Sequence, residues 1–186
     1  LSADLYAGEY YDANKQIKNW NCADFMDSGW TSCMEANYGY ENLVSQIGEP
    51  VVIVKELPVS RLTKSPKGEW ILDFGQNIAG FVRMKVNAPK GTQITLEHCE
   101  ILDKQGNFFN NIQGAGGVGK GVDQKDVYVC DGTSATYEPH FTYHGFRYVC
   151  VTGIEPKAED FTACVASTEK ANLGTFKTSD ERLNRF

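Results

Sequence analysis

The segment GAGGVGKG, at residues 114–121, has the residue types of a loop that binds phosphate groups. In such a loop, backbone N–H groups and a lysine hold the phosphates of a nucleotide, and a serine or threonine after the lysine holds Mg²⁺. Gly114, Gly119 and Lys120 match the spacing of this motif, but the hydroxyl position is occupied by Gly121. The match is therefore incomplete at the residue that would hold the metal ion.

The neighbours of this segment also argue against a nucleotide site. A phosphate loop follows a buried strand and begins a helix whose N-terminus faces the anion. Here the polar stretch GNFFNNIQ precedes the segment, and VDQKDVYVC, which has the pattern of a turn and then a strand, follows it. Five glycines within eight residues favour a flexible connection. We therefore expect a glycine-rich loop that binds no nucleotide.

Histidines are the second candidate group for chemistry. His140 and His144 are four residues apart in HFTYH, and on an extended strand such residues share a face. A third histidine, His98, lies elsewhere in the sequence. Histidines beside tyrosines are more often structural than metal-ligating. The sequence therefore favours structural histidines, and we expect no metal ion and no other cofactor.

A pair of carboxylates could catalyse glycoside hydrolysis, one as the acid and one as the base. The spacing of the candidates singles out no pair, and charged residues on an outer strand face are usually solvated. The candidates are Glu56, Asp73, Glu97, Glu100, Asp103 and Glu138. We therefore assign no catalytic residue.

The stretch DFGQN, at residues 73–77, places three hydrogen-bonding side chains and a glycine after an apolar strand. This composition is typical of a tightly hydrogen-bonded corner. Contact with a neighbouring domain is the alternative interpretation.

The composition excludes several classes of partner. The 186 residues are 41% hydrophobic and 12% aromatic, which is enough for a substantial core. A net charge of −6 is unsuited to a nucleic-acid backbone, and no apolar run is long enough to cross a bilayer. We therefore expect no nucleic-acid partner and no membrane partner. The chain begins with LSADLYAGEYYD, without a signal peptide or an initiating methionine, so we expect a fragment of a longer protein.

Six cysteines could form three disulfides, but their positions favour free thiols. Four of them lie in strand-like runs, where a free cysteine packs as a small apolar residue. Cys22 and Cys33 are the pair whose disulfide state the sequence leaves open.

From about residue 48 the chain shows short strands punctuated by turns, and no helical segment lies among them. In GFVRMKV, for example, Val82, Met84 and Val86 alternate with two cationic residues. This pattern predicts an all-β fold, a jelly roll or concanavalin-like β-sandwich, over residues 48–170. Residues 1–47, which are aromatic and rich in turns, are expected to end a preceding domain. Thr178 and Glu181 form a capping-box pattern, which predicts that a helix begins near the C-terminus.

Three segments together resemble the bacterial α-L-rhamnosidases: ILDFGQNIAGFVRMKV, APKGTQITLEHCEILDKQGN and YEPHFTYHGFRYVCVTG. The resemblance is to the concanavalin-like β-sandwich that precedes the catalytic (α/α)₆ barrel in those enzymes. It implies that residues 1–47 close a galactose-binding-like β domain and a connector, and that residues 171–186 lead into the barrel.

The resemblance also implies a function for the parent protein, the hydrolysis of terminal α-L-rhamnosyl groups of plant glycosides or polysaccharides with inversion. Both catalytic carboxylates of the family come from the barrel, so none is assigned here. A structural or interdomain role is implied for six residues: Asp73, Gln76, Asn77, Tyr143, His144 and Arg147. The implied partners are the barrel, the neighbouring β domains of the same chain and the rhamnosylated substrate. An extracellular or periplasmic location is favoured over the cytoplasm.

Two alternatives to a scaffold domain stay open. The chain could be a carbohydrate-binding module for rhamnose or a related sugar, with exposed aromatic faces as the sugar platform. Exposure of Trp20, Trp30 or Trp70 on a concave surface would favour binding, and burial of all three would favour a scaffold. An independent hydrolase would require two convergent carboxylates in a cleft.

Overall fold

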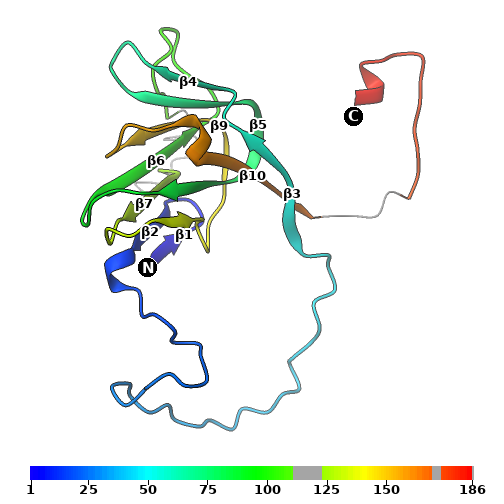
Figure 1. Ribbon diagram of the computed structural model, residues 1–186. Coiled ribbons are helices and arrows are strands. Elements are labelled where there is room, and N and C mark those ends of the chain that lie inside the picture. The colour runs from blue at the N-terminus through cyan, green and yellow to red at the C-terminus, as the bar shows by residue number, and fades with distance from the viewer. Residues whose placement is uncertain (111–122, 169–172, 186) are drawn as a thin grey trace.

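The computed structural model describes residues 1–110, 123–168 and 173–185, and within them almost all regular structure is β-strand (Figure 1). The strands are β1 (Ser2–Asp4), β2 (Gly8–Asp12), β3 (Val51–Pro58), β4 (Arg61–Lys64), β5 (Trp70–Val86), β6 (Gln93–Cys99), β7 (Lys125–Val129), β8 (Ala135–Tyr137), β9 (His144–Thr152) and β10 (Phe161–Thr168). Three short 3₁₀ turns, η1 (Ala13–Lys15), η2 (Ala158–Asp160) and η3 (Leu183–Arg185), complete the elements. The all-β prediction is confirmed. The glycine-rich segment 114–121 lies outside the described residues.

The strands pair into one sheet that curls around a single core (Figure 1). Its order is β1-β2-β7-β6-β9-β5-β10-β3, and β4 and β8 pair with β5 beside this path. Neighbours are antiparallel except β2 and β7, which run parallel. The strand with the pattern FRYVCVT was expected to be central because it is apolar on both faces, and β9 indeed lies between β6 and β5. Within the described residues, no helix is long and apolar enough to span a membrane.

The stretch DFGQN lies within one long strand, whereas the sequence suggested two strands with a corner between them. β5 runs without a break from Trp70 to Val86, and its pairing with β9 shifts between Asp73 and Ile78. Gly75 has a φ of +83°, a left-handed conformation that glycine adopts without strain. The corner is therefore an irregularity that bends a continuous strand, as a β-bulge does.

The alternation seen in the sequence sets the inner face of the sheet. Val82, Met84 and Val86 are buried, while Arg83 and Lys85 between them are not. On β9 the largest fully buried side chain is Phe146, whose ring meets that of Phe74 at 5.8 Å between centroids and 81° between planes. Edge-to-face contact of this kind is the favoured geometry of aromatic pairs. These side chains belong to the one core cluster that joins β5, β6 and β9.

The N-terminal strands belong to the same sheet, although a long irregular segment separates them from the next strand. Tyr10, Tyr11 and Asp12 of β2 align with Val127 to Val129 of β7. Residues 16–50 then contain no strand, and many of their apolar side chains are exposed (Figure 1). The residues between Ile17 and β3 therefore contribute little to the core in this chain.

At the C-terminal turn, the hydrogen bond to the Thr178 side chain comes from a different residue than the capping box predicted. Thr178 Oγ1 accepts a hydrogen bond from Asp180 N at 3.0 Å, and Asp180 Oδ1 accepts one from Arg182 N at 2.9 Å. The predicted capping box required Thr178 and Glu181 to exchange such bonds. The single 3₁₀ turn η3 follows, and the carbonyl oxygen of Asp180 accepts hydrogen bonds from Leu183 N and Asn184 N.

All six cysteines are described and all are free thiols, which agrees with the prediction for the four in strand-like runs and answers the question left open for Cys22 and Cys33. Cys22 and Cys33 are exposed, and the other four are buried. Burial raises the pKa of the Cys99 thiol to about 11 and that of Cys150 to about 12. Only the thiolate form of a cysteine reacts readily. Burial should therefore slow the reaction of these two thiols in two ways, by blocking the reagent and by keeping the thiol protonated.

We therefore expect a disulfide-exchange reagent to modify two thiols of the reduced native protein quickly and the remaining four only after unfolding. The measurement is a thiol titration with and without denaturant. A Cys22→Ser, Cys33→Ser double variant should lose the fast phase entirely. A third fast-reacting thiol in the native protein would contradict the burial described above.

Candidate functional site

The irregularity in β5 is joined to β9 by an ion pair. Arg147 Nε and Nη2 donate to the two carboxylate oxygens of Asp73 at 2.8 and 3.0 Å, a bidentate geometry. Gly75 N also donates to Asp73, at 2.7 Å. The hydrogen bonds from Arg147 hold the pKa of Asp73 below its ordinary value, against the opposing effect of burial. This pair spans the point where the register of the two strands shifts.

The other four residues for which the resemblance implies a structural or interdomain role are not part of this ion pair. Gln76, Asn77 and Tyr143 are exposed, and Asn77 Nδ2 donates to Glu100 at 3.2 Å. His144 points into the interior. The structure therefore brings Asp73 and Arg147 together, and it distributes the remaining four over the surface and the core. Their structural or interdomain role stays a prediction.

The low pKa of Asp73 leads to a prediction about acid stability. A depressed pKa contributes stability above the unfolded value, and this contribution disappears as the pH falls below about 4. Because both partners are partly exposed, we expect Asp73→Asn to lower the free energy of unfolding by only about 1 kcal/mol at pH 7. Urea unfolding should show this difference shrinking between pH 7 and a pH below the lowered pKa of Asp73.

The control for this prediction is Asp24→Asn, since Asp24 is exposed in the irregular segment. It should match the wild type at both pH values. A deficit of Asp73→Asn that stayed the same at low pH would show that the variant disturbs packing and not the charge.

A second cluster lies in the interior and is centred on Glu9 of β2, whose side chain is 1% exposed. Its carboxylate accepts hydrogen bonds from Tyr137 Oη at 2.9 Å, His140 N at 2.8 Å, His140 Nδ1 at 3.0 Å and Phe141 N at 3.2 Å. Burial and the charge of Glu9 raise the pKa of Tyr137, so its hydroxyl stays a donor. Glu9 thereby ties the N-terminal strand to the connection between β8 and β9.

A buried trio adjoins Glu9. Asp126 of β7 accepts a hydrogen bond from Glu9 N at 3.0 Å, and both of its oxygens lie 3.1 Å from His144 Nε2. His98 Nε2 lies 3.9 Å from Asp126, and the rings of His98 and His144 are 4.3 Å apart between centroids. All three side chains are at most 1% exposed. Together they could hold a metal ion, since their ligand atoms lie within 4.8 Å of one another.

The charges within this trio follow from its burial. Burial, together with the neighbouring His144, lowers the pKa of His98 to about 4, so this ring is neutral at neutral pH. Burial alone would raise the pKa of Asp126, but the hydrogen bond from His144 and the nearby imidazoles outweigh it and keep that pKa low. The trio therefore carries an ionised carboxylate in the interior.

The histidines do not pair as the sequence suggested. His140 and His144 were expected to share a face of an extended strand, but β9 begins only at His144. His140 lies in the preceding connection and binds Glu9, whereas His144 faces His98 and Asp126. The period-two rule failed because the segment between the two histidines is not a strand.

Of the six candidate carboxylates, Glu138 lines one of the two hollows described below and the other five line neither. Asp73 is held by Arg147, Glu56 and Glu138 both contact Arg83, Asp103 binds Asn107 and Glu100 receives Asn77. Glu9 and Asp126, which are joined by the hydrogen bond from Glu9 N to the Asp126 carboxylate, are both buried. A sugar could not reach them without unfolding the sheet.

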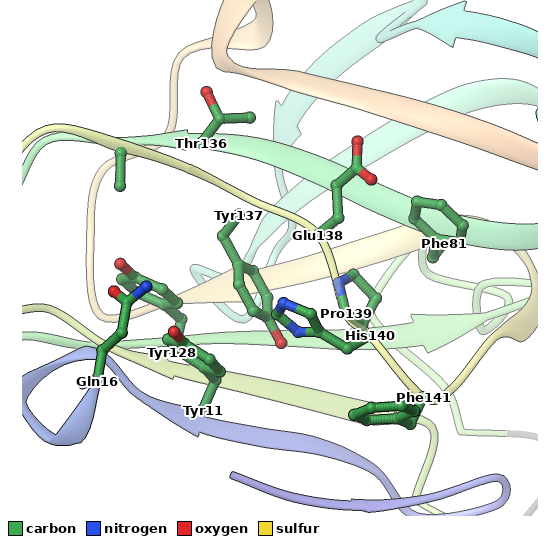
Figure 2. Close-up of a pocket in the computed structure, with 11 residues that line it drawn as sticks. Tyr11, Gln16, Phe81, Tyr128, Thr136, Tyr137, Glu138, Pro139, His140 and Phe141 are labelled. Carbon is green, nitrogen blue, oxygen red and sulfur yellow. The ribbon is translucent and has the colours of Figure 1, made fainter. Parts of the chain in front are cut away.

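A hollow lies over the connection between β8 and β9. It has a volume of about 780 Å³ and its walls include Tyr11, Tyr128, Tyr137, His140 and Phe141. Figure 2 shows the rings of Tyr11, Tyr128, Tyr137 and His140 gathered on one side of this hollow. The ring of Tyr11 packs against other rings of the protein: it stacks on Tyr128 with 5.6 Å between centroids and on His140 with 5.4 Å.

A second hollow of about 630 Å³ adjoins the first and shares three of its residues, Tyr11, Gln16 and His140. Its wall also includes Trp20 and Trp30, whose side chains are 60% and 53% exposed. Rows of exposed aromatic rings around a concave surface, with a few polar groups, are typical of a ligand site.

Glu9 and Asp126 are the polar residues that the sequence interpretation missed. A weak signal was present for Asp126, because in DVYVC it shares a strand face with Tyr128 and Cys130, both of which are buried. No local pattern marked Glu9, since its hydrogen-bond partners lie more than 100 residues away.

Comparisons with known proteins agree with one another. The family model described as the bacterial alpha-L-rhamnosidase concanavalin-like domain matches residues 63–167, and the alpha-L-rhamnosidase N-terminal domain matches residues 1–55. An alpha-L-rhamnosidase of Streptomyces avermitilis is 37% identical over 100% of this chain and 18% of its own length. One from Formosa agariphila is 32% identical over 98% of this chain and 19% of its length.

Solved structures show the same likeness. Native alpha-L-rhamnosidase from Aspergillus terreus has a TM-score of 0.84 and 30% identity, covering 100% of this chain and 21% of that one. The Streptomyces avermitilis enzyme complexed with L-rhamnose has a TM-score of 0.84 and 38% identity, covering 99% of this chain and 18% of that one. The chain thus spans about a fifth of the length of the relatives that it matches.

Proposed function

The chain belongs to the bacterial α-L-rhamnosidases, whose concanavalin-like domain it matches, and we propose that it is a non-catalytic β-domain of an enzyme that hydrolyses terminal α-L-rhamnosyl residues with inversion. The acid and the base of that reaction would then lie in another part of the parent protein. An inverting site needs two accessible carboxyl groups roughly 6.5–9.5 Å apart, with room for a water molecule between them.

The observation that carries this proposal is the state of the carboxylates. Several of the candidate carboxylates are engaged by arginine or amide groups, as Asp73 is by Arg147 and Asp103 by Asn107. Glu9 and Asp126 are buried, and the partly exposed Glu56 and Glu138 are both held by Arg83. Within the described residues the arrangement therefore suits a scaffold better than a hydrolase.

The exposed apolar residues support a role in contact with other domains. Met34, Tyr38 and Ile47 are almost fully exposed in the irregular segment before β3. A soluble protein rarely leaves so many large apolar side chains in water, and such surface usually marks an interface. We propose that neighbouring domains of the parent chain, including the (α/α)₆ barrel, cover them. The domain divisions at residues 47 and 170 belong to this proposal.

Hydrolysis of a chromogenic α-L-rhamnoside tests the proposal, with the parent protein and this chain assayed side by side. The parent should cleave the substrate and the chain should not. NMR of the first-formed sugar should show the anomer opposite to that of the substrate. Cleavage by the chain alone would place catalytic carboxylates within it and refute the proposed role.

A carbohydrate-binding function is the second candidate, and the hollow beside Trp20 and Trp30 favours it. Both indoles are exposed on a concave surface, and Gln16 and His140 supply polar groups in the same wall. Sugar rings present flat apolar faces that stack on aromatic side chains, while their hydroxyl groups hydrogen-bond at the rim. Rhamnose or a related sugar is the proposed ligand.

Titration with L-rhamnose, followed by tryptophan fluorescence and calorimetry, tests this candidate. Binding in the millimolar range is expected, and Trp20→Ala or Trp30→Ala should weaken it by about tenfold or more. Trp70→Phe is the matched control, since Trp70 lies on β5 under Lys64 and outside the hollow. Equal binding by wild type and the Trp20 and Trp30 variants would contradict the assignment.

A further inference from the structure

The buried trio of His98, Asp126 and His144 has more hydrogen-bond acceptors than N–H groups that can donate to them. His98 Nδ1 lies 2.8 Å from the carbonyl oxygen of Gln124, which can only accept, so Nδ1 carries the hydrogen of the neutral ring. His144 Nε2 faces the carboxylate of Asp126 and carries its hydrogen for the same reason. The lone pairs of His98 Nε2 and His144 Nδ1 are therefore left over, and neither atom has a partner among the described residues.

Unmatched buried acceptors are costly, so the arrangement calls for a positive centre or a donor. A water molecule that donates to two acceptors at about 2.8 Å holds them roughly 4.5 Å apart. Two ligands on one zinc-like ion, with bonds of about 2.0–2.1 Å, lie about 3.4 Å apart in a tetrahedral site. Asp126 Oδ2 lies 3.9 Å from His98 Nε2, between these two values, whereas its 3.1 Å distance to His144 Nε2 is that of the hydrogen bond described above.

The surroundings of the trio resemble the support that metal ligands receive in proteins. A ligating histidine usually donates its second N–H to a carbonyl or a carboxylate, which fixes its ring and its tautomer. His98 does so with Gln124, and Glu9 N fixes the carboxylate of Asp126. Two imidazoles and a carboxylate are the ligand types preferred by zinc and similar divalent ions.

We propose that His98, Asp126 and His144 bind a divalent transition-metal ion of the zinc class as a structural cross-link. His98 lies on β6, Asp126 on β7 and His144 on β9, so one ion would join three strands of the sheet. The His98 and His144 rings are inclined by 34°, and binding turns one of them about its χ2 bond so that both lone pairs converge. Binding through Nδ1 of His144 would use the lone pair that is left over and would leave the Nε2–H group directed at Asp126, with no net release of a proton.

Metal analysis of the purified protein, free of any histidine tag, is the first test. The protein is unfolded with a chelator, refolded with or without Zn²⁺ or Co²⁺, and freed of excess ion. About one ion per chain should be retained, and thermal unfolding should move upward by roughly 5 °C or more. With Co²⁺, visible absorption bands should report ligation by nitrogen and oxygen.

His98→Gln should abolish retention, and His140→Gln is the matched control because His140 is half-exposed and binds Glu9 outside the trio. Should His98→Gln fail to fold, the wild-type stoichiometry and the Co²⁺ spectrum still decide the question. Two results would overturn the proposal: wild-type protein that retains less than about a tenth of an ion with an unchanged midpoint, or His98→Gln protein that retains as much ion as the wild type.

Discussion

Replacing Glu9 with alanine is expected to lower the free energy of unfolding by about 3 to 5 kcal/mol. The Glu9 carboxylate accepts hydrogen bonds from Tyr137, His140 and Phe141, and all of these donors lose their partner when it is removed. Two of them are backbone N–H groups, which cannot turn towards another acceptor. The loss should fall mainly on the junction between β2 and the connection before β9.

Glu9→Gln provides the sharper measurement. It keeps the volume of the side chain but replaces one acceptor oxygen with a donor NH₂ group, so we expect a loss of about 2 kcal/mol. For a chain of this size, each kcal/mol corresponds to a fall of about 2–4 °C in the thermal midpoint. Glu49→Gln is the matched control, since Glu49 is exposed, and its midpoint should not move. If both glutamine variants behaved alike, the buried network would contribute nothing to stability.

Phe146→Ala is expected to be equally damaging, with a loss of about 3 to 5 kcal/mol. Phe146 is fully buried on the central strand β9, and its ring packs edge-to-face against Phe74 and against His98. Alanine would leave a cavity that the sheet cannot close, because β9 is fixed by hydrogen bonds to β5 and β6. Urea unfolding should show a lower midpoint and an unchanged slope.

Two further variants separate cavity formation from loss of an aromatic ring. Phe146→Leu retains most of the volume and should cost about half as much. Phe176→Ala removes a ring that is 76% exposed and should change stability by less than about 0.5 kcal/mol. If Phe176→Ala were as destabilising as Phe146→Ala, the core would extend beyond the cluster described above.

The alternation of apolar residues along single strands determined much of the fold. Val82, Met84 and Val86 indicated one buried face, and the doubly apolar run of β9 indicated a central strand. Both features are local, because successive side chains of a strand point to opposite faces whatever the partner strand is. The resemblance to the α-L-rhamnosidases was also visible in the sequence, because its motifs are continuous stretches that each cover only a few neighbouring strands and turns.

The residues that DFGQN contacts could not be predicted from this stretch. Asp73 meets Arg147 at a separation of 74 residues, and the partner depends on which strands of the sheet become neighbours. The sequence suggested a corner between two strands, whereas pairing with β9 on both sides of the irregularity holds β5 as one strand.

Glu9, Asp126 and the histidines show most clearly what only the tertiary structure decided. By itself the sequence determined an all-β chain, its strand faces, free thiols at the four strand cysteines and a family likeness. It could not place Glu9 against Tyr137 and His140, or His98 against His144, because these contacts join strands that are distant in sequence. A charged side chain looks the same in a sequence whether it is solvated or buried. Only the curling of the sheet, which brings β2, β6, β7 and β9 around one interior, removed these groups from water and made them partners.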